Sequence, residues 1–568
     1  MRARATNRFL LLLSACSLLG CNRSDAAANT TAPASPESAS APRAQPLPSD
    51  AIDRLLVERW RGSGVTVAER ASDEEFLRRV TLDLVGRIPT AEELSAFVQD
   101  TGDDKRARVT QTLLGSEEWA EYWGEVYTDL LVGQDIKEAG AANPMREWLR
   151  GELGRGEGWD ELVDAMVTAQ GPISKNPASA FIASNLKAGG PETVTAAVSR
   201  KFLGVQIECA QCHDHPYDDF AREDFWGMAA FFARTKVRRS EADRKARKKQ
   251  RMLEAMGMGM EAEAERKKDK KGKKRDFEVW EKPRGELRIY PKDDEGNRGP
   301  DKVRIDPAFM GERVDFDEGA RRASLSAQMR KSPLLARAAV GFVWTEFMGR
   351  SITTHWDDLP LDDEDLPRLL DRLADEFVEH DYDLRWLQAR IVASEAYARS
   401  SRGAAEGRNE AEAVFARAAV RPLSSDQLFS SLLQATALES VQNKRFSRAV
   451  RQRKKAALKE FAFIFSDDEM GEADAFSGNV PQSLLLFNGQ LTNQAVLRRP
   501  GNTTDLLLKI DDDDERAGFA YRVFYGREAS GEEIDTAIEL VNAAGGGESA
   551  WEDLLFAMIN STEFLTNH

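Results

Sequence analysis

The sequence predicts a mainly α-helical protein with two helical domains, and with a small β-hairpin region and a charged insertion between them. Apolar residues recur three and four positions apart from Ala51 onward, which indicates amphipathic helices. Capping boxes, in which Ser or Thr is followed three residues later by Glu or Gln, mark helix starts at Thr90, Ser424 and Ser530. The best strand patterns are confined to residues 277–316.

The composition excludes several classes of function. The chain has 568 residues, with 79 Lys and Arg against 95 Asp and Glu, and a formal charge of −16. This acidic balance argues against nucleic acid as a partner. Four cysteines in a chain of this length exclude a disulfide-held scaffold. Because cysteine and histidine are both scarce, any place where they cluster is informative.

Residues 1–20 have the features of a lipoprotein signal peptide. Three arginines precede an apolar run from Phe9 to Leu19, which is too short to span a bilayer. The run ends Leu-Leu-Gly before Cys21, and this pattern resembles a bacterial lipobox. We therefore expect lipid on Cys21 and an exported, membrane-anchored protein, periplasmic or at the cell surface. An ordinary secretory signal that is cleaved nearby is the alternative.

Residues 21–49 are rich in Ala, Ser, Pro and Thr, and we expect them to form a disordered tether. The first helical domain is expected over residues 50–239, and a basic, Met-containing insertion over residues 240–276. Residues 236–275 hold 17 Lys and Arg against 7 Asp and Glu. A solvated segment or exposed helix is the expectation here, with docking to an acidic partner or Cu(I) binding by thioethers as alternatives.

A small β and linker region is expected over residues 277–318. Residues 286–290 and 302–305 alternate around a Gly-containing link, which favours a hairpin. The second helical domain is expected over residues 319–568. Its acidic run, residues 511–514, is expected at a helix N-terminus or in a solvated loop rather than in a calcium site.

A weak internal repeat joins the two halves. Gly-Arg pairs occur at residues 86–87, 349–350 and 526–527. We expect each glycine to end a helix and a capped helix to follow. Related tails recur at Ser116, Ser394 and Ser561. The repeat predicts one helix–turn–helix packing unit that is used in both halves.

One segment concentrates the soft ligands. Residues 209–215 read Cys-Ala-Gln-Cys-His-Asp-His, which contains C-x-x-C-H, the pattern of c-type haem attachment. Two thiols one helical turn apart can add to the two vinyl groups of haem, and the next histidine then lies where its nitrogen can bind iron. We therefore predict haem c, with Cys209 and Cys212 as attachment sites and His213 as proximal ligand.

Other interpretations of this segment stay open. Cys209 and Cys212 are alternatively a disulfide pair, or they join His213 and His215 in a metal site that suits zinc. The remaining alternative is that the motif is a packing element with no chemical function. The candidates for a sixth haem ligand, each also typical of a packing or surface residue, are Met228, His355 and His380. No catalytic residue is assigned, since the chain has no Gly-rich phosphate loop, G-x-S-x-G or H-E-x-x-H.

Several stretches resemble a known pair of domains. Those similar to the cytochrome-like domain of unknown function of planctomycete proteins, the PSCyt type, are residues 76–90, 146–149, 202–217 and 225–232. Those similar to its usual companion, the PSD-type domain, are residues 343–350, 384–402, 421–424 and 557–564. The resemblance covers roughly residues 50–567 and implies an exported protein, but it implies no particular activity.

Two functions follow from the sequence. The first is a c-type haem or redox-linked protein that acts through the cysteine motif, with a redox or envelope protein as its partner. The second is a non-enzymatic binding or assembly scaffold of the cell envelope, in which the motif is a structural disulfide or a metal clip. The motif's covalent state distinguishes them.

Overall fold

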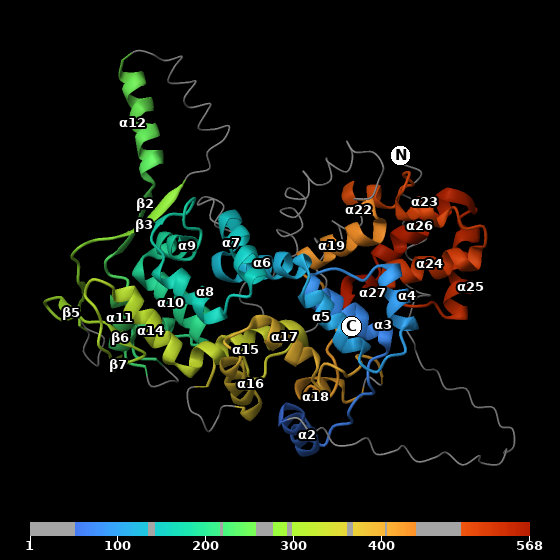
Figure 1. Cartoon of the computed structure of the whole chain (residues 1–568), viewed down its shortest axis with the longest axis horizontal. Helices are drawn as coiled ribbons and strands as arrows, with labels where there is room; N and C mark the ends of the chain where they lie inside the picture. Colours follow the sequence, from blue (N-terminus) through green and yellow to red (C-terminus); the bar gives the residue numbers. More distant parts are fainter. Residues whose placement is uncertain are drawn as a thin grey trace. The chain divides into compact units, whose positions relative to one another are not determined.

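The computed structural model describes the chain in eight stretches: residues 51–133, 142–215, 220–256, 276–291, 298–360, 367–403, 406–438 and 490–568 (Figure 1). The described residues are mainly helical, and their sheets are antiparallel with only two or three strands, which confirms the predicted fold class. No helix in these stretches is long and apolar enough to cross a bilayer. The signal peptide, Cys21, the tether and the part of the insertion after Met256 lie outside the described residues.

The chain divides into two compact units. Among the described residues, unit 1 joins residues 51–111 with those from residue 393 onward, and unit 2 consists of those between residues 112 and 392. Unit 1 is therefore built from two stretches that are far apart in the sequence. The boundaries expected from the sequence, which follow chain order, stay a prediction about the domains.

The regular elements of the described part of unit 1 are helices and two short strands. Its elements are α2 (Ala51–Ser63), α3 (Asp73–Val85), α4 (Ala91–Gln99), α5 (Lys105–Leu114), α18 (Arg408–Ala413), β8 (Arg421–Pro422), α19 (Ser425–Thr436), α22 (Gln490–Ala495), α23 (Thr503–Leu507), α24 (Asp513–Tyr525), α25 (Gly531–Ala543), α26 (Gly547–Ile559), α27 (Thr562–Leu565) and β9 (Thr566–Asn567). The last strand, β9, pairs with β8 in antiparallel register. The predicted capping boxes at Thr90, Ser424 and Ser530 are all formed.

The predicted repeat is present in unit 1. Helices α3 and α24 both end at a glycine in the left-handed conformation, Gly86 with φ 70° and Gly526 with φ 69°. At Gly526 a Cβ atom would lie 3.3 Å from the side chain of Pro89, which belongs to the other copy's turn. Glycine is therefore required there both for its conformation and for the close approach of the two copies.

The residue after each glycine fixes the following helix. Arg87 makes two hydrogen bonds to Glu93, of 2.8 and 2.9 Å, and Arg527 makes two to Glu533, of 2.8 and 2.7 Å. Each glutamate is also the third residue of the next helix's capping box. The third Gly-Arg pair departs from the expectation: Gly349 ends α15 (Pro333–Met348), but α16 (Arg368–Glu379) begins without a side-chain cap.

Unit 2 combines helices with small sheets. Besides α15 and α16 it contains α6 (Glu117–Val132), α7 (Ala142–Arg155), α8 (Trp159–Thr168), β1 (Gly171–Pro172), α9 (Ser179–Gly189), α10 (Pro191–Leu203), the 3₁₀-helix η1 (Glu208–Gln211), α11 (Arg222–Ala230), β2 (Thr235–Arg239), α12 (Glu241–Ala255), β3 (Phe277–Glu281), β4 (Leu287–Ile289), β5 (Val303–Ile305), β6 (Ala308–Phe309), β7 (Glu312–Arg313), α14 (Arg321–Lys331) and α17 (Leu384–Val392).

The aromatic face of α6 lies in the core of unit 2. Trp119, Trp123 and Tyr127 are each 1 % exposed. The ring of Tyr127 lies 4.7 Å from that of Trp159, and Trp159 in turn contacts Phe202 on α10. Because aromatic side chains bury large apolar areas, this cluster joins α6, α8 and α10 into one layer that supports the segment after α10.

Short strands occupy the predicted β region. β4 pairs with β5 in antiparallel register, which confirms the hairpin, and β3 lies between β1 and β2 in a three-stranded sheet. α12 begins two residues after β2 ends, so the described part of the basic insertion is an exposed helix. In unit 1 the acidic run lies at a helix N-terminus, as expected, where Asp512 caps α24 through the backbone N–H of Glu515.

Candidate functional site

The cysteine motif lies in a short connection between two buried helices of unit 2. α10 ends at Gly204, which adopts the left-handed conformation with φ 66°. A Cβ atom there would lie 2.8 Å from the side chain of Leu359, so this turn requires glycine. The chain then forms η1; Ile207, the residue before it, and Ala210 within it are 1 % and 0 % exposed. The connection is thus held against the core by one side of its single turn.

The two thiols lie on the opposite, solvent-facing side of the same turn. Cys209 and Cys212 are both exposed, and neither is in a disulfide. Because a 3₁₀-helix has three residues per turn, side chains at positions i and i+3 lie one above the other. The backbone N–H of Cys212 donates to the carbonyl of Cys209 over 3.4 Å, which closes this turn. Both sulfurs can therefore reach one ligand placed beside η1.

His213 follows the second cysteine and is exposed. Its Nδ1 lies 2.7 Å from the backbone oxygen of Asp214. A carbonyl oxygen only accepts hydrogen bonds, so this contact requires the proton on Nδ1, and the lone pair of the neutral imidazole is then on Nε2. His215 is half-buried, and its backbone N–H donates to the carbonyl of Phe220 over 2.7 Å. The two histidines therefore differ in their access to a ligand.

Helix α11 holds the motif in place. The carboxylate of Asp214 accepts a 2.8 Å hydrogen bond from the backbone N–H of Arg222, at the first turn of α11. The indole N–H of Trp226, one turn later, donates to the carbonyl of Gln211 over 3.1 Å. Arg222 itself is 8 % exposed, and its Nε and Nη1 atoms make no hydrogen bond in the described part of the chain. The bonds to Asp214 and Gln211 tie the second half of the motif to α11.

A carboxylate with a raised pKa precedes the first cysteine. Burial raises the pKa of Glu208, and the nearby Asp357 and Asp358 add to this, although its own backbone N–H and Arg200 oppose it. Arg200 forms an ion pair with Asp357 at 2.5 Å. The segment of residues 355–359 therefore packs beside the start of the motif, which fits the 2.8 Å hydrogen bond from Leu359 N–H to the carbonyl of Gly204.

The three candidate sixth ligands lie in different surroundings. Met228 belongs to α11 and is fully buried, with 0 % of its surface exposed. His380 ends α16, stacks on Trp386 with ring centres 4.0 Å apart, and bonds the carbonyl of Glu376. His355 is exposed and belongs to the segment that packs beside the motif. The assignment of a sixth ligand stays a prediction.

The structure does not bring the four candidate zinc ligands together. Within the described stretches, the sulfur atoms of Cys209 and Cys212 and the imidazole nitrogens of His213 and His215 are not gathered within 4.8 Å of one another. A zinc site from these four residues would need the chain to rearrange, since structural zinc requires four ligands at about 2.0–2.3 Å from the ion. The assignment of His213 and His215 as metal ligands therefore stays a prediction.

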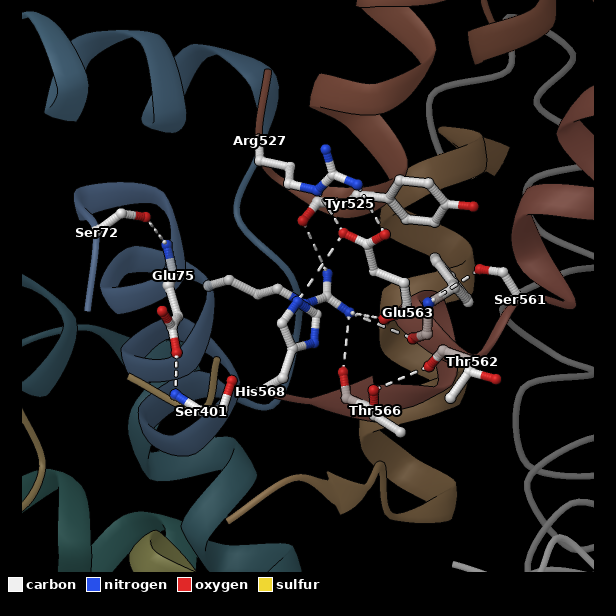
Figure 2. A network of polar contacts seen from close by, with 12 residues as sticks. Ser72, Glu75, Ser401, Tyr525, Arg527, Ser561, Thr562, Glu563, Thr566 and His568 are labelled. Atoms are coloured by element: carbon white, nitrogen blue, oxygen red, sulfur yellow. Dashed lines mark hydrogen bonds and ion pairs between the residues drawn. The ribbon is translucent and has the colours of Figure 1, made fainter. Parts of the chain in front are cut away.

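A second cluster of polar residues, in unit 1, is not indicated by any sequence motif. Figure 2 shows it around the C-terminal residues, where Tyr525, Glu563, Thr566 and His568 gather. At its centre is Arg78 of α3, which is 1 % exposed and whose Nη2 donates to three backbone oxygens at 3.0–3.3 Å, those of Glu563, Phe564 and Thr566. Burial lowers the pKa of Arg78 to about 10, so it stays charged at neutral pH.

The neighbouring residues of α3 extend this cluster. Burial would raise the pKa of Glu75, but Arg79 and hydrogen bonds from Ser400 and Ser401 outweigh burial and lower the pKa. Asp83 is fully buried, and burial raises its pKa. It accepts hydrogen bonds of 2.7 Å from the hydroxyl of Tyr397 and from the side-chain amide of Asn567. The only sequence signal is that charged residues interrupt the apolar pattern of residues 76–85.

The histidine in this cluster predicts how the free energy of unfolding depends on pH. Burial lowers the pKa of His568 to about 3, and the charge of Arg78 adds to the effect. The native state therefore keeps His568 neutral while the unfolded chain binds a proton below the ordinary pKa of about 6.5. The free energy of unfolding should fall by roughly 2 kcal/mol between pH 6.5 and pH 5 from this residue alone.

Urea denaturation over this pH range measures the effect, with His568→Gln as the comparison. The variant should lose most of the slope, because glutamine does not titrate. Paired carboxylates such as Glu533, whose pKa lies below the ordinary 4.5, contribute only at lower pH. Equal slopes in the two proteins would contradict the buried, neutral state of His568.

Two family models match successive segments of the chain. Residues 51–237 match the family model PSCyt2, described as a protein of unknown function (DUF1549). Residues 321–541 match the model PSD1, also described as a protein of unknown function (DUF1553). No curated protein and no solved structure matches the chain. The order of the two matches agrees with the resemblance noted in the sequence, and neither family description supplies an activity.

Proposed function

We propose, for this chain with a PSCyt2 domain followed by a PSD1 domain, both of unknown function, that the cysteine motif binds a c-type haem covalently for electron transfer or redox chemistry. Cys209 and Cys212 hold the haem through thioether bonds, and His213 binds the iron. The protein is exported and anchored to the membrane by lipid on Cys21. Its partner is a redox or envelope protein. No residue of the chain is assigned to catalysis.

The observation that carries the proposal is the placement of two exposed thiols on one 3₁₀ turn, followed by an exposed histidine whose Nδ1 is held by the oxygen of Asp214, which leaves Nε2 as the nitrogen for a ligand. Each thiol adds across one vinyl group: sulfur bonds one carbon, the thiol hydrogen goes to the other, and no atom is lost. When bound, haem supplies one-electron chemistry. The chain's own residues attach it, and the Nδ1 contact of His213 orients the imidazole for the iron.

The setting fits this chemistry. Covalent haem attachment takes place after export, and the signal peptide predicts export. The exposure of both thiols leaves them open to the attachment reaction, whereas a disulfide between them would block it. Buried residues flank η1, and the indole of Trp226 on α11 bonds the carbonyl of Gln211, so the attachment site is supported by the core of unit 2.

The test is expression of the whole precursor in a host that exports it and carries haem-maturation factors. The membrane-extracted protein should show a Soret band, and its mass should equal that of the mature chain plus one haem. The mass of the N-terminal peptide reports lipid on Cys21. The matched control is Cys209→Ser with Cys212→Ser, which should be exported equally and carry no haem.

Other outcomes favour the scaffold function. Absence of both the Soret band and the haem mass would overturn the proposal. Thiol counting and metal analysis on the same sample would then separate the two forms of that function: a disulfide removes both free thiols, and a zinc clip gives one zinc per chain.

A further inference from the structure

The basic helix α12 is the part of unit 2 that the proposed haem function does not use. In Figure 1 it extends from the end of β2 away from the helices of its unit. Lys245, Lys248 and Arg251 are among its exposed cations. The helix lies in the stretch of residues 236–275 that carries a net charge of +10 by its Lys, Arg, Asp and Glu.

The far end of α12 is apolar. Met252 and Met256 are 55 % and 63 % exposed, one helical turn apart, and Leu253 lies beside them, half-buried. No large apolar residue precedes Met252 in the helix. Since β2 leads into the first residue of α12, the apolar end is the end that points away from unit 2 (Figure 1). We call the basic residues 244–251 the shaft of the helix and the apolar end, residues 252–256, its tip.

The distribution of these side chains selects the kind of partner. A helix that binds in a protein groove carries apolar anchors along its length, at positions i, i+3, i+4 and i+7. In α12 the exposed apolar residues are confined to the tip, so a groove would face only charged and small residues along the shaft. A lipid surface fits better, because headgroup phosphates contact the cations while the tip reaches the acyl boundary.

We propose that α12 is a membrane-contact arm, whose basic shaft binds anionic lipid headgroups and whose Met252, Leu253 and Met256 enter the bilayer interface. The rest of the chain explains why such an arm is useful. Without residues 1–20, which hold three Arg and no acid, and without the +10 of residues 236–275, the chain carries −29. An anionic bilayer repels that acidic body, so α12 supplies the attractive contact and sets which side of unit 2 faces the membrane.

The test uses the chain from Asn22 to His568, which lacks the leader and Cys21 but keeps every described residue. Flotation with vesicles of phosphatidylcholine plus phosphatidylglycerol should recover the protein, and vesicles of phosphatidylcholine alone should not. Replacing Lys245, Lys248 and Lys249 with Gln should weaken binding roughly 100-fold, at about 1 kcal/mol per charge. The control replaces the exposed Lys175, Lys282 and Lys331 with Gln, which removes the same charge and should leave binding unchanged.

A second variant tests the tip. Met252→Gln with Met256→Gln should weaken binding to anionic vesicles while leaving the salt dependence as in the wild-type chain. Circular dichroism confirms that each variant keeps its helix content. The proposal is overturned if the wild-type chain ignores anionic vesicles, if both lysine variants bind alike, or if the tip variant binds as wild type. Self-association at low salt without vesicle binding would instead assign the arm to a second copy of this chain.

Discussion

Arg78→Ala is expected to destabilise unit 1 by at least about 3 kcal/mol. The guanidinium of Arg78 is fully buried and donates to the carbonyls of Glu563, Phe564 and Thr566. Alanine leaves these buried oxygens without their donor, and each unsatisfied group costs about 1–3 kcal/mol. It also leaves a cavity where a long side chain was packed. The C-terminal helix α27 and strand β9 should therefore lose their attachment to α3.

Hydrogen exchange at increasing urea concentration measures this effect in the peptides of α3, α24 and α27. Protection in these helices should collapse at a lower urea concentration in the Arg78→Ala variant than in the wild-type chain. The matched control is Arg108→Ala, because the Arg108 side chain is 48 % exposed and forms surface ion pairs with Asp100 and Asp104. Such pairs contribute at most about 1 kcal/mol. If both variants unfolded at the same urea concentration, Arg78 would not have the central role that its contacts indicate.

Local sequence signals predicted the helix starts and turns correctly. Thr90, Ser424 and Ser530 form their capping boxes because each needs only a residue three positions away. Gly86 and Gly526 end helices because the left-handed conformation is a local requirement. The composition of the insertion predicted a solvated segment or an exposed helix, and its described part is the helix α12. These features depend on a few neighbouring residues, and a single sequence contains all of them.

Local sequence signals of this kind could not predict how unit 1 is organised. Arg78 bonds residues 447 to 488 positions further along the chain, and no periodicity encodes a partner at that separation. The sequence shows only that charges occupy buried positions of α3, which breaks the amphipathic pattern without naming their partners. The pairing of residues 51–111 with the C-terminal stretch in one unit is likewise a result of packing over long separations.

The candidate haem site is an intermediate case. Its ligand types and spacing were readable, because c-type attachment depends on five consecutive residues. The bonds that hold the motif, from Trp226 to the carbonyl of Gln211 and from the backbone of Arg222 to Asp214, were not. Nor does the sequence indicate that His213 and His215 differ in exposure. That difference separates the two residues experimentally.

His213→Ala is expected to lower the yield of covalently bound haem at least about tenfold, whereas His215→Ala should keep the wild-type yield. His213 is exposed, and its Nδ1 contact with the oxygen of Asp214 leaves Nε2 to bind iron. Loss of an outer-shell partner already costs about 10–100-fold in metal binding, so loss of the ligand itself should cost no less. His215 is half-buried and its backbone N–H donates to the carbonyl of Phe220, so we expect it to contribute to the structure of the motif rather than to bind the iron.

Mass spectrometry and the Soret absorbance per chain give the yield for both variants, and the spectrum of any remaining haem reports its axial ligand. His213→Met provides the conservative test, because methionine also binds haem iron. It should restore part of the yield with an altered spectrum. The reverse result, loss of haem in His215→Ala alone, would move the iron ligand to His215. Unchanged yield and spectrum in both alanine variants would show that neither histidine binds iron, and the motif's chemistry would then rest on its two thiols.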